Sequence, residues 1–136
     1  MPEAHRFAAK SEARALLAEA ATEVLAIDNY VGAGTLDCLL DVEQPIRLLT
    51  GDKTNSIGAE FDRALEEFRS EGRTIEVRRH PRLHDRYVIF NDRCWLVGGS
   101  LKDAGRKAFN MIEIVDSKTA IVEDVERKWA EAKAYP

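Results

Sequence analysis

The sequence lacks several features that would place it in familiar classes of protein. It has two cysteines, Cys38 and Cys94, and both stand among apolar neighbours. Neither lies in a CxxC or paired CxxH spacing, so the pattern argues against a disulfide scaffold and offers no zinc ligand cluster. We therefore expect two buried free thiols, no metal or other cofactor, and a reducing, cytoplasmic setting.

Long apolar runs are missing as well. No stretch approaches the roughly 20 apolar residues of a membrane-spanning helix, and no long apolar segment marks a signal peptide. No amphipathic helix with a basic polar face is evident, which argues against membrane docking and lipid hydrolysis. The net charge is −4, so the molecule as a whole does not attract nucleic acid, although local charge can differ.

The residues that are present predict one globular domain over 1–136. Of these residues, 45% are hydrophobic and 32% are charged, which is enough to bury a core without staples. The domain divides into an N-terminal helix over 1–23, a core over 24–115 and a C-terminal helix over 117–134. The inner face of the last helix is expected at Ile121, Val125 and Trp129.

The core alternates between short apolar segments and helical patterns. Six segments are typical of strands: Val24–Ile27, Ile46–Thr50, Thr74–Arg78, Tyr87–Phe90, Cys94–Val97 and Met111–Val115. One predicted helix is capped by Thr35 and runs to Leu40; another is capped by Ser56 and ended by Gly72. The second helix presents an apolar face at Phe61, Leu65 and Phe68. Because helices alternate with strands early and strands cluster late, we expect an α/β sandwich with a mixed β-sheet flanked by helices.

Positive charge gathers in one part of this acidic chain. The stretch between positions 73 and 86 contains two acidic residues and five arginines: Arg73, Arg78, Arg79, Arg82 and Arg86. The same stretch holds His80 and His84, and a second small cluster follows at Lys102, Arg106 and Lys107. Arginine pairs bidentately with phosphate, so the stretch predicts a phosphate-bearing ligand. A solvated, salt-bridged strand edge is the alternative interpretation.

His84 and Arg86 stand one residue apart at the start of the strand predicted over Tyr87–Phe90. Residues i and i+2 of a strand share a face, so the imidazole and the guanidinium are expected side by side. A tight turn over Asn91–Arg93 makes a hairpin, which returns the chain to the Gly98–Ser100 loop beside His84. The glycines of this loop permit close approach of a ligand, and its serine adds a hydroxyl.

This grouping has the ingredients of phosphodiester chemistry. A histidine between fixed cations can attack a phosphodiester and hold a covalent phosphohistidine. The cations stabilise charge on the phosphoryl oxygens, and a second histidine must protonate the leaving oxygen. Lys102 and Asp103 add polar groups on the same rim. In the alternative interpretation, His84 is a strand-end side chain bonded to a carboxylate such as Asp85.

The motif-bearing stretch resembles the signature of the phospholipase D superfamily, H-x-K-x4-D-x6-G-S-x-N. The chain has His84, Arg86, Asn91 and Gly98 at the spacing of the signature's histidine, lysine, aspartate and glycine. The HDRY and SLKD stretches are similar to those of a divergent bacterial and mobile-element branch. The resemblance spans about 24–115 and implies a phospholipase-D-like half with nuclease-type chemistry.

Four positions depart from the signature. Arg86 stands in place of the lysine and keeps its charge but not its geometry. Asn91 stands in place of the aspartate and cannot supply a carboxylate, although Asp92 follows it. Gly99 takes the position of the serine, and Leu101 that of the asparagine.

The basic stretch and the resemblance together give candidate roles. The candidate catalytic residues are His84 as nucleophile, Arg86 as phosphate clamp and Ser100. The candidate phosphate-binding residues are Gly98, Gly99, Lys102, Arg79 and Arg82. The candidate polar supports are Asn91, Asp92 and Asp103.

The superfamily's site uses two motifs, whereas this chain contains one. The resemblance therefore implies a symmetric homodimer, in which one His84 is the nucleophile and the other is the acid. His80 is the internal alternative, although it precedes Pro81 and is expected on the approach loop rather than on a strand. Sites of this kind need no metal.

Three functions stay open. The first is a metal-independent phosphodiesterase of nuclease type, whose basic stretch holds the backbone of a nucleic acid. The second is a binding or effector module that kept the fold and lost turnover, and that tethers nucleic acid or another domain of a larger protein. The third is an interaction domain whose function lies in dimerisation.

Overall fold

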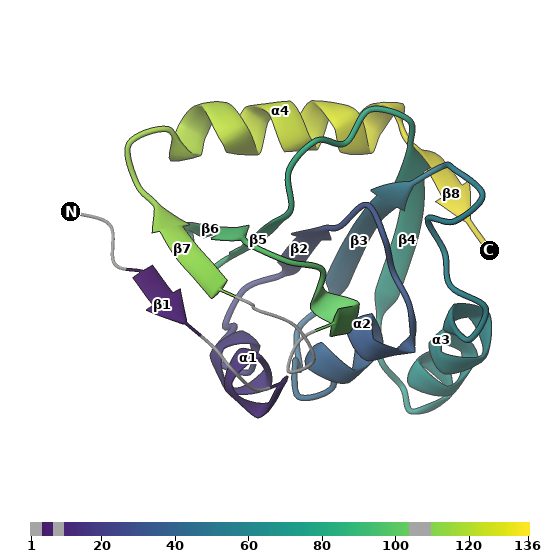
Figure 1. Ribbon diagram of the computed structural model, residues 1–136. Helices are drawn as coiled ribbons and strands as arrows, with labels where there is room; N and C mark the ends of the chain where they lie inside the picture. The colour runs from purple at the N-terminus through teal and green to yellow at the C-terminus, as the bar shows by residue number, and fades with distance from the viewer. Residues whose placement is uncertain (1–3, 7–9, 104–109) are drawn as a thin grey trace.

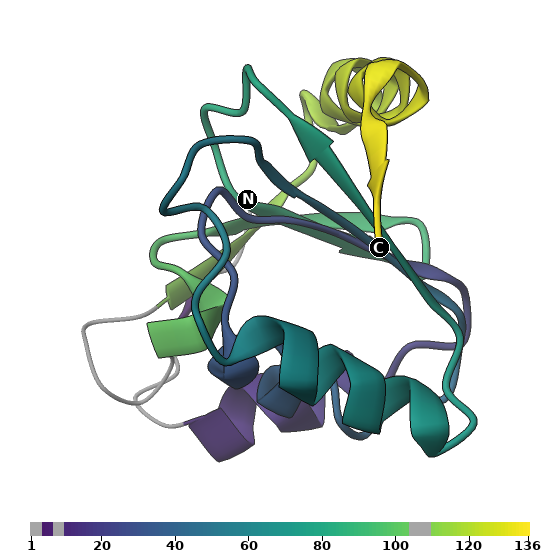
Figure 2. The same cartoon turned by 90° about the vertical axis from the view of Figure 1, so that its right-hand side faces the viewer.

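The computed structural model describes residues 4–6, 10–103 and 110–136. These residues form one mixed sheet of eight strands. Helices α1, α2 and α3 cover one face of the sheet, and α4 lies across the other face (Figures 1 and 2). The prediction of an α/β sandwich with a mixed sheet is therefore confirmed.

The strands are arranged in the order β1-β7-β6-β5-β2-β3-β4-β8. Their bounds are β1 (Ala4–Arg6), β2 (Val24–Ile27), β3 (Ile46–Gly51), β4 (Ile75–His80), β5 (Tyr87–Phe90), β6 (Arg93–Val97), β7 (Asn110–Ile114) and β8 (Lys133–Tyr135). The helices are α1 (Lys10–Leu17), α2 (Ala33–Cys38), α3 (Phe61–Ser70) and α4 (Lys118–Glu131), with a short 3-10 helix η1 (Leu101–Asp103). The neighbours β2, β3 and β4 run parallel, and the other neighbouring pairs are antiparallel. Each of the six predicted strands is present, with small shifts at its ends.

The larger apolar core lies between the sheet and the three helices α1, α2 and α3. Val24 and Ala26 of β2 belong to it. From α3 it takes the predicted apolar face, and all three of its residues are buried: Phe61, Leu65 and Phe68. Burying such a face is what stabilises a short helix, since isolated helices of this length are marginal in water.

A smaller core lies between the sheet and α4. It contains Leu25 and Ile27, the β2 residues that alternate with those of the larger core. Val125 and Trp129 of α4 are buried against them, and Ile121 packs at the margin, as predicted. Because successive strand residues point to opposite faces, β2 contributes to both cores, and its apolar run marks it as central.

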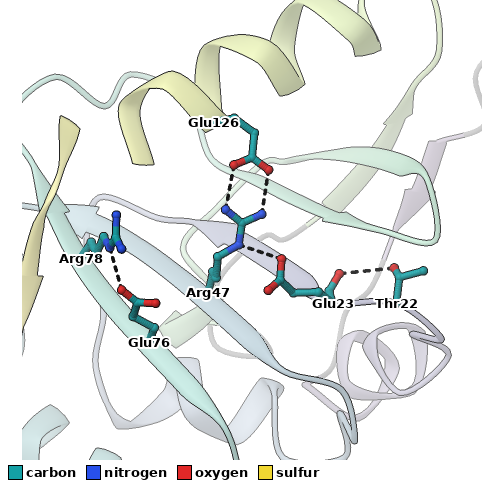
Figure 3. A network of polar contacts seen from close by, with 6 residues as sticks. All are labelled: Thr22, Glu23, Arg47, Glu76, Arg78 and Glu126. Atoms are coloured by element: carbon teal, nitrogen blue, oxygen red, sulfur yellow. Dashed lines mark hydrogen bonds and ion pairs between the residues drawn. The ribbon is translucent and has the colours of Figure 1, made fainter. Parts of the chain in front are cut away.

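Arg47 of β3 ties α4 to the sheet. Its guanidinium donates to both carboxylate oxygens of Glu126 at 2.7 Å and, through Nε, to Glu23 at 2.8 Å (Figure 3). Arg47 and Arg78 also lie over the ring of Trp129, at 5.2 and 4.4 Å from its centroid. The bidentate pair of Arg47 with Glu126 fixes the orientation of the guanidinium, and Arg47 and Arg78 cover the indole of Trp129. These contacts give α4 one defined position over the sheet.

A two-residue turn joins β5 to β6, which confirms the predicted hairpin. Asn91 and Asp92 have φ values of 53° and 57°, the left-handed pair that a type I′ turn requires. Asn91 is fixed further by the chain before β2. Its Oδ1 accepts the N–H of Ala21 at 2.7 Å, and its Nδ2 donates to the carbonyl of Glu19 at 3.0 Å. The turn therefore lies near the start of β2.

The N-terminal helix is shorter than the sequence predicts. The pattern over 1–23 favours one helix, whereas the structure has strand β1 and then α1, which ends at Leu17. Residues 1–3 and 7–9 of this prediction lie outside the described ranges. Ala4 pairs with the free edge of β7, so strand pairing outweighs the helix propensity of this alanine-rich segment.

The C-terminal helix also ends early. The pattern predicts a helix to Ala134, but α4 ends at Glu131 and the chain becomes extended at Ala132. The last residues form β8, in which Tyr135 lies opposite Val77 of β4. Pairing satisfies the backbone groups along the edge of β4, and this gain overrides local helix propensity.

Neither predicted capping residue is a helix N-cap. Thr35 lies inside α2, where its Oγ1 accepts the N–H of the N-cap residue Gly32 at 3.0 Å. The N-cap position of α3 is Glu60, and Ser56 instead accepts a backbone N–H of the preceding loop. Gly72 follows α3 with φ of 85°, a conformation that favours glycine, as predicted.

Both cysteines are buried thiols that form no disulfide with each other, as predicted. The thiol of Cys38 donates to the carbonyl of Leu101 at 3.3 Å. Burial raises the pKa of Cys94 to about 11, so this thiol is protonated at neutral pH. Among the described residues, no helix is both long enough and apolar enough to cross a membrane.

Candidate functional site

The ends of four strands meet the starts of their antiparallel neighbours at one edge of the sheet. Because β2, β3 and β4 are parallel and β5 and β6 form an antiparallel hairpin beside them, the ends of β2, β3, β4 and β6 share this edge with the start of β5. Asp28 follows β2, His80 ends β4, and Arg86 precedes β5. The Gly98–Ser100 loop follows β6. Open α/β sheets commonly bind ligands at such an edge.

Asp28 is the buried centre of a polar cluster at this edge, and its side chain is 1% exposed. Its Oδ1 accepts the N–H of Tyr30 at 3.0 Å and Nε of Arg86 at 3.3 Å. Its Oδ2 accepts the N–H of Leu101 at 2.9 Å, and Ser100 Oγ lies 3.1 and 3.0 Å from the two oxygens. We call these five residues the Asp28 cluster. Three separate segments of the chain thus meet on one carboxyl group.

The hydroxyl of Ser100 has three acceptors within reach. Its Oγ lies 2.8 Å from the carbonyl oxygen of Tyr30 as well as close to both oxygens of Asp28, and its one proton is donated to one of them at a time. Burial raises the pKa of Asp28, and the N–H groups of Leu101 and Tyr30, the Ser100 hydroxyl and Arg86 oppose the shift. These donors therefore offset only part of the cost of burying this carboxyl group, and its pKa stays above the ordinary value.

Arg86 keeps hydrogen-bond donors for a ligand. Its side chain is 28% exposed, and Asp28 takes only its Nε. The two terminal nitrogens make no hydrogen bond to any residue within the described ranges. The guanidinium carbon lies 5.9 Å from the centroid of the Tyr30 ring, which covers part of its surface. The free fork is the group with which arginine grips a phosphate.

His84 does not join this cluster. The strand begins only at Tyr87, so the alternation that would place His84 beside Arg86 does not reach it, and His84 is exposed in the preceding loop. It borders a small hollow on the α4 side of the sheet, which Val125 also lines. Arg86 instead bonds to Asp28, which also binds Leu101 of the larger core on the α1–α3 side. The expectation of a shared face is therefore wrong. The Gly98–Ser100 loop, which was expected beside His84, is linked to Arg86 instead, because Asp28 accepts hydrogen bonds from both Ser100 and Arg86.

The imidazole of His84 has no hydrogen-bond or ion-pair partner in the part of the chain that the structure describes. Asp85, the carboxylate that could have held it, accepts instead from the hydroxyl of Tyr87 at 3.4 Å. The interpretation of His84 as a strand-end side chain bonded to Asp85 is thus not supported. Both of its ring nitrogens remain available to a ligand.

His84 also lines an open cleft of about 970 Å³ bounded by the loop after β4, by α4 and by β8. The charged residues of its lining are five bases and three acids: Arg79, Arg82, Arg127, Lys128 and Lys133, with Asp52, Asp124 and Glu131. The whole chain has a net charge of −4, so this cleft is a local excess of positive charge. Such an excess suits an anionic ligand.

Three of these bases form no direct ion pair among the residues described, although Arg82 lies close enough to Glu131 to lower its pKa. Arg79 donates to the carbonyls of Gly51 at the end of β3 and of Lys53 in the loop that follows, at 2.9 Å each, rather than to a carboxylate. Arg82 and Lys133 extend from the loop after β4 and from β8, and both are exposed. The two bases of α4, by contrast, share Asp124. Arg79 and Arg82, both predicted to bind phosphate, therefore lie on the cleft with His84.

His80 is the last residue of β4, which corrects its predicted place on the approach loop. It is buried, and its Nδ1 accepts the N–H of Arg82 at 3.0 Å. Nδ1 therefore has no proton, and Nε2 donates to Glu131 at 3.0 Å. This hydrogen bond lowers the pKa of Glu131. Both ring nitrogens of His80 are thus engaged, whereas those of His84 bond to none of the residues that the structure describes.

The predicted polar supports Asn91 and Asp92 lie at the hairpin turn, at the opposite end of β5 from the site. Asp92 extends into solvent and pairs with Lys118 at 3.4 Å. Gly98 lies at the site edge, where its N–H donates to the carbonyl of Asn110 at 2.8 Å. A Cβ at Gly98 would come within 2.2 Å of the Asn110 side chain, which explains the glycine. Its neighbour in the loop, Gly99, is half-buried.

Lys102 lies in η1, which packs against α2 on the same side of the sheet as the Asp28 cluster. Its backbone follows directly from Leu101, one of the donors to that cluster. The side chain of Asp103 lies outside what the structure describes, as do Arg106 and Lys107 of the second basic cluster. Of the three cations in the second basic cluster, Lys102 is the one whose position the structure describes, and it lies at the site edge.

Sequence reasoning missed Asp28 and the α4 wall of the cleft. A polar residue directly after an apolar strand is a weak signal, and the partners Arg86 and Ser100 stand 58 and 72 positions away. The bases of α4 look like an ordinary solvated helix face until the fold places them opposite His84. Within the described ranges, no three His, Cys, Asp or Glu side chains gather as metal ligands do.

Neither a protein-family model nor a curated protein matches this chain. Solved structures do match. The archaeal chromatin protein TrmBL2, whose structure shows a novel mode of DNA binding, has a TM-score of 0.63 and 16% identity over 98% of this chain. NucT from Helicobacter pylori has a TM-score of 0.62 and 7% identity, and 99% of each chain is covered. The chain shares their fold. It spans 54% of the TrmBL2 chain, about half its length.

Proposed function

We propose that the chain is a metal-independent phosphodiesterase of nuclease type, which works through a covalent phosphohistidine at His84. The observation that carries the proposal is the state of His84, an exposed imidazole with no bonding partner among the described residues, on a cleft with more bases than acids. A free imidazole is a nucleophile, and fixed cations stabilise the charge that develops on phosphoryl oxygens. The resemblance of the motif to the phospholipase D superfamily supports the same reaction.

The reaction has two steps. In the first, an imidazole nitrogen of His84 bonds to phosphorus while the bond from phosphorus to the leaving oxygen breaks. A second histidine, initially protonated, gives its proton to that oxygen. In the second step the same histidine takes a proton from water, the water oxygen bonds to phosphorus, and the phosphorus–nitrogen bond breaks. The product is a phosphomonoester, and both histidines return to their starting state.

We propose that a second copy of the chain supplies the second histidine. His80 is the internal alternative, but its Nδ1 accepts a backbone N–H and its Nε2 donates to Glu131. Neither nitrogen can serve a leaving group without breaking one of these bonds. A symmetric homodimer that brings two copies of His84 to one phosphate requires no such rearrangement.

Nucleic acid is the substrate that the charge pattern favours. Arg79, Arg82 and Lys133 come from the end of β4, the loop after it and the start of β8, and all three line the cleft, where they can contact several phosphates of a backbone. TrmBL2 shares the fold and is described as binding DNA. Both observations support a partner with a repeating phosphate backbone.

Cleavage of labelled single- and double-stranded DNA in excess EDTA tests the proposal. We expect the wild type to cleave and His84→Ala to lose activity by a factor on the order of 10⁴ or more, with its melting temperature unchanged. Arg63→Ala is the matched control, since Arg63 is exposed on α3 and pairs with Glu67. Cleavage that survives in His84→Ala, or that EDTA abolishes, would contradict the mechanism.

A binding module without turnover is the second candidate, and one observation favours it. Arg86 and Ser100 gather around Asp28, whereas His84 faces the cleft on the α4 side, so one chain does not assemble the motif around one phosphate. This alternative predicts that the protein retains DNA, that Arg86→Ala loses it, and that no product forms.

A further inference from the structure

Asp28 joins the two segments that carry the recognisable motif. Arg86 stands at the start of β5, and Ser100 and Leu101 follow the end of β6. All three direct a donor to the same carboxyl group, at 2.9 to 3.3 Å. The group is also anchored on its own strand end by the N–H of Tyr30. The backbone already pairs β5 with β6, and the N–H of Val97 donates to the carbonyl of Arg86 at 2.9 Å. Asp28 adds a side-chain link between the two segments beyond this pairing.

The way in which Asp28 binds Arg86 leaves the arginine usable. A carboxylate that pairs with the terminal nitrogens of a guanidinium occupies the donors that a phosphate would take. Asp28 takes Nε at 3.3 Å, so the two terminal nitrogens have no partner within the described part of the chain. The Tyr30 ring lies against the same guanidinium at 5.9 Å. The orientation of Arg86 is thus fixed while its fork stays open.

We infer that Asp28 is a positioning residue that holds Arg86 and the Ser100–Leu101 segment together as one phosphate-binding unit. The inference rests on the proposed function, in that the ligand is a phosphodiester of a nucleic acid, and it adds a residue outside the motif. Asp28 is 1% exposed and acts through Arg86 rather than on the ligand. Rigid support of this kind is what keeps a binding group in productive geometry.

A double-mutant cycle tests the inference. The probe is a fluorescently labelled single-stranded DNA oligonucleotide, and its Kd is measured at low salt for the wild type, Asp28→Asn, Arg86→Ala and the double variant. We expect Arg86→Ala to raise Kd about tenfold, the loss of a charge-assisted contact. We expect Asp28→Asn to raise Kd about fivefold alone and not at all when combined with Arg86→Ala, because residues that act as a unit are not additive.

Asp41→Asn is the matched control, because Asp41 also pairs with an arginine, Arg14, at 2.8 Å on the surface. It should leave Kd unchanged. The amide-like Nε–H signal of Arg86 in a ¹⁵N NMR spectrum gives a second readout, assigned by its absence in Arg86→Ala. It should move in Asp28→Asn and stay in place in Asp41→Asn. Should Asp28→Asn fail to fold, Ser100→Ala replaces it in the cycle, with the same loss of effect expected beside Arg86→Ala.

Three results would overturn the inference. If Asp28→Asn raised Kd by the same factor in the wild type and in Arg86→Ala, Asp28 would have a structural role only. If Asp28→Asn lowered Kd, the role of Asp28 would be only to neutralise the charge of Arg86. A wild type that binds no oligonucleotide would overturn both this inference and the proposed function. Binding with the expected coupling but without cleavage would contradict the catalytic proposal alone, and cleavage without coupling would contradict the role of Asp28 alone.

Discussion

At the scale of single residues, Asp28 and His84 represent two different uses of a polar side chain. Asp28 is buried, and its carboxyl group is matched by donors from three segments, as buried polar groups require. His84 is exposed and has no partner in the described ranges. The first arrangement holds structure in place, and the second leaves a group free to react. The proposed chemistry depends on both.

Asp28 should make stability depend on pH. Burial raises its pKa in the folded state above the ordinary value of 3.8, so between the two pKa values the folded protein binds more protons than the unfolded chain. The contribution of this group to stability is then greatest at low pH and falls as pH rises through that window. Urea unfolding at about pH 4.5 and about pH 7 should show the wild type losing stability relative to Asp28→Asn as pH rises. A constant difference would contradict this assignment.

Motif spacing identifies His84 and Arg86 because a nucleophile and a cation stand only two positions apart in the sequence. It cannot show which strand face His84 takes, since that depends on where β5 begins. Nor can it pair Arg86 with Asp28, whose strand lies 58 positions earlier. At the residue scale, the sequence therefore identifies the candidate residues of the motif but not the side chains that they contact.

At the scale of elements, the contacts of α4 with the sheet centre on Trp129, which Arg47 and Arg78 cover. Trp129 is buried in the smaller core, and Arg47 lies over it while pairing with Glu126. We expect Trp129→Ala to cost about 3 kcal/mol of unfolding free energy, because a large apolar contact is lost. Arg47→Ala should cost about 1 kcal/mol, because its acidic partners are partly exposed and screened by solvent.

Urea unfolding of both variants, with the exposed Arg63→Ala as control, measures the two costs. Should Arg47→Ala cost as much as Trp129→Ala, the ion pairs rather than apolar burial would hold the helix. Because α4 forms one wall of the cleft, both variants should also raise KM for DNA if the cleft binds it. The element that covers the sheet would then be an element of the site.

The elements that sequence predicts well are those with local causes. The apolar runs of β2 and β5, the turn at Asn91–Asp92 and the apolar face of α3 are each specified by neighbouring residues. β1 and β8 are missed because they are short and form on free edges of β7 and β4, far away in the sequence. Alanine-rich and lysine-rich segments favour helix until such an edge is available.

At the scale of the whole molecule, an acidic chain concentrates positive charge at one place. The whole chain has a net charge of −4, whereas five bases and three acids line the cleft. One chain presents His84 at the hollow on the α4 side, whereas Arg86 bonds to Asp28 at the same edge. A second copy is the proposed means of completing one site from these two parts.

The measurement that tests the central claim most directly is the trapping of a covalent intermediate. Wild type and His84→Ala are mixed with DNA in excess EDTA, denatured within the first turnover, and examined by peptide mass spectrometry. The account predicts a phosphoryl adduct on the His84 peptide of the wild type and none in the variant. Product formed by the wild type without any adduct, or with an adduct on another residue, would contradict it.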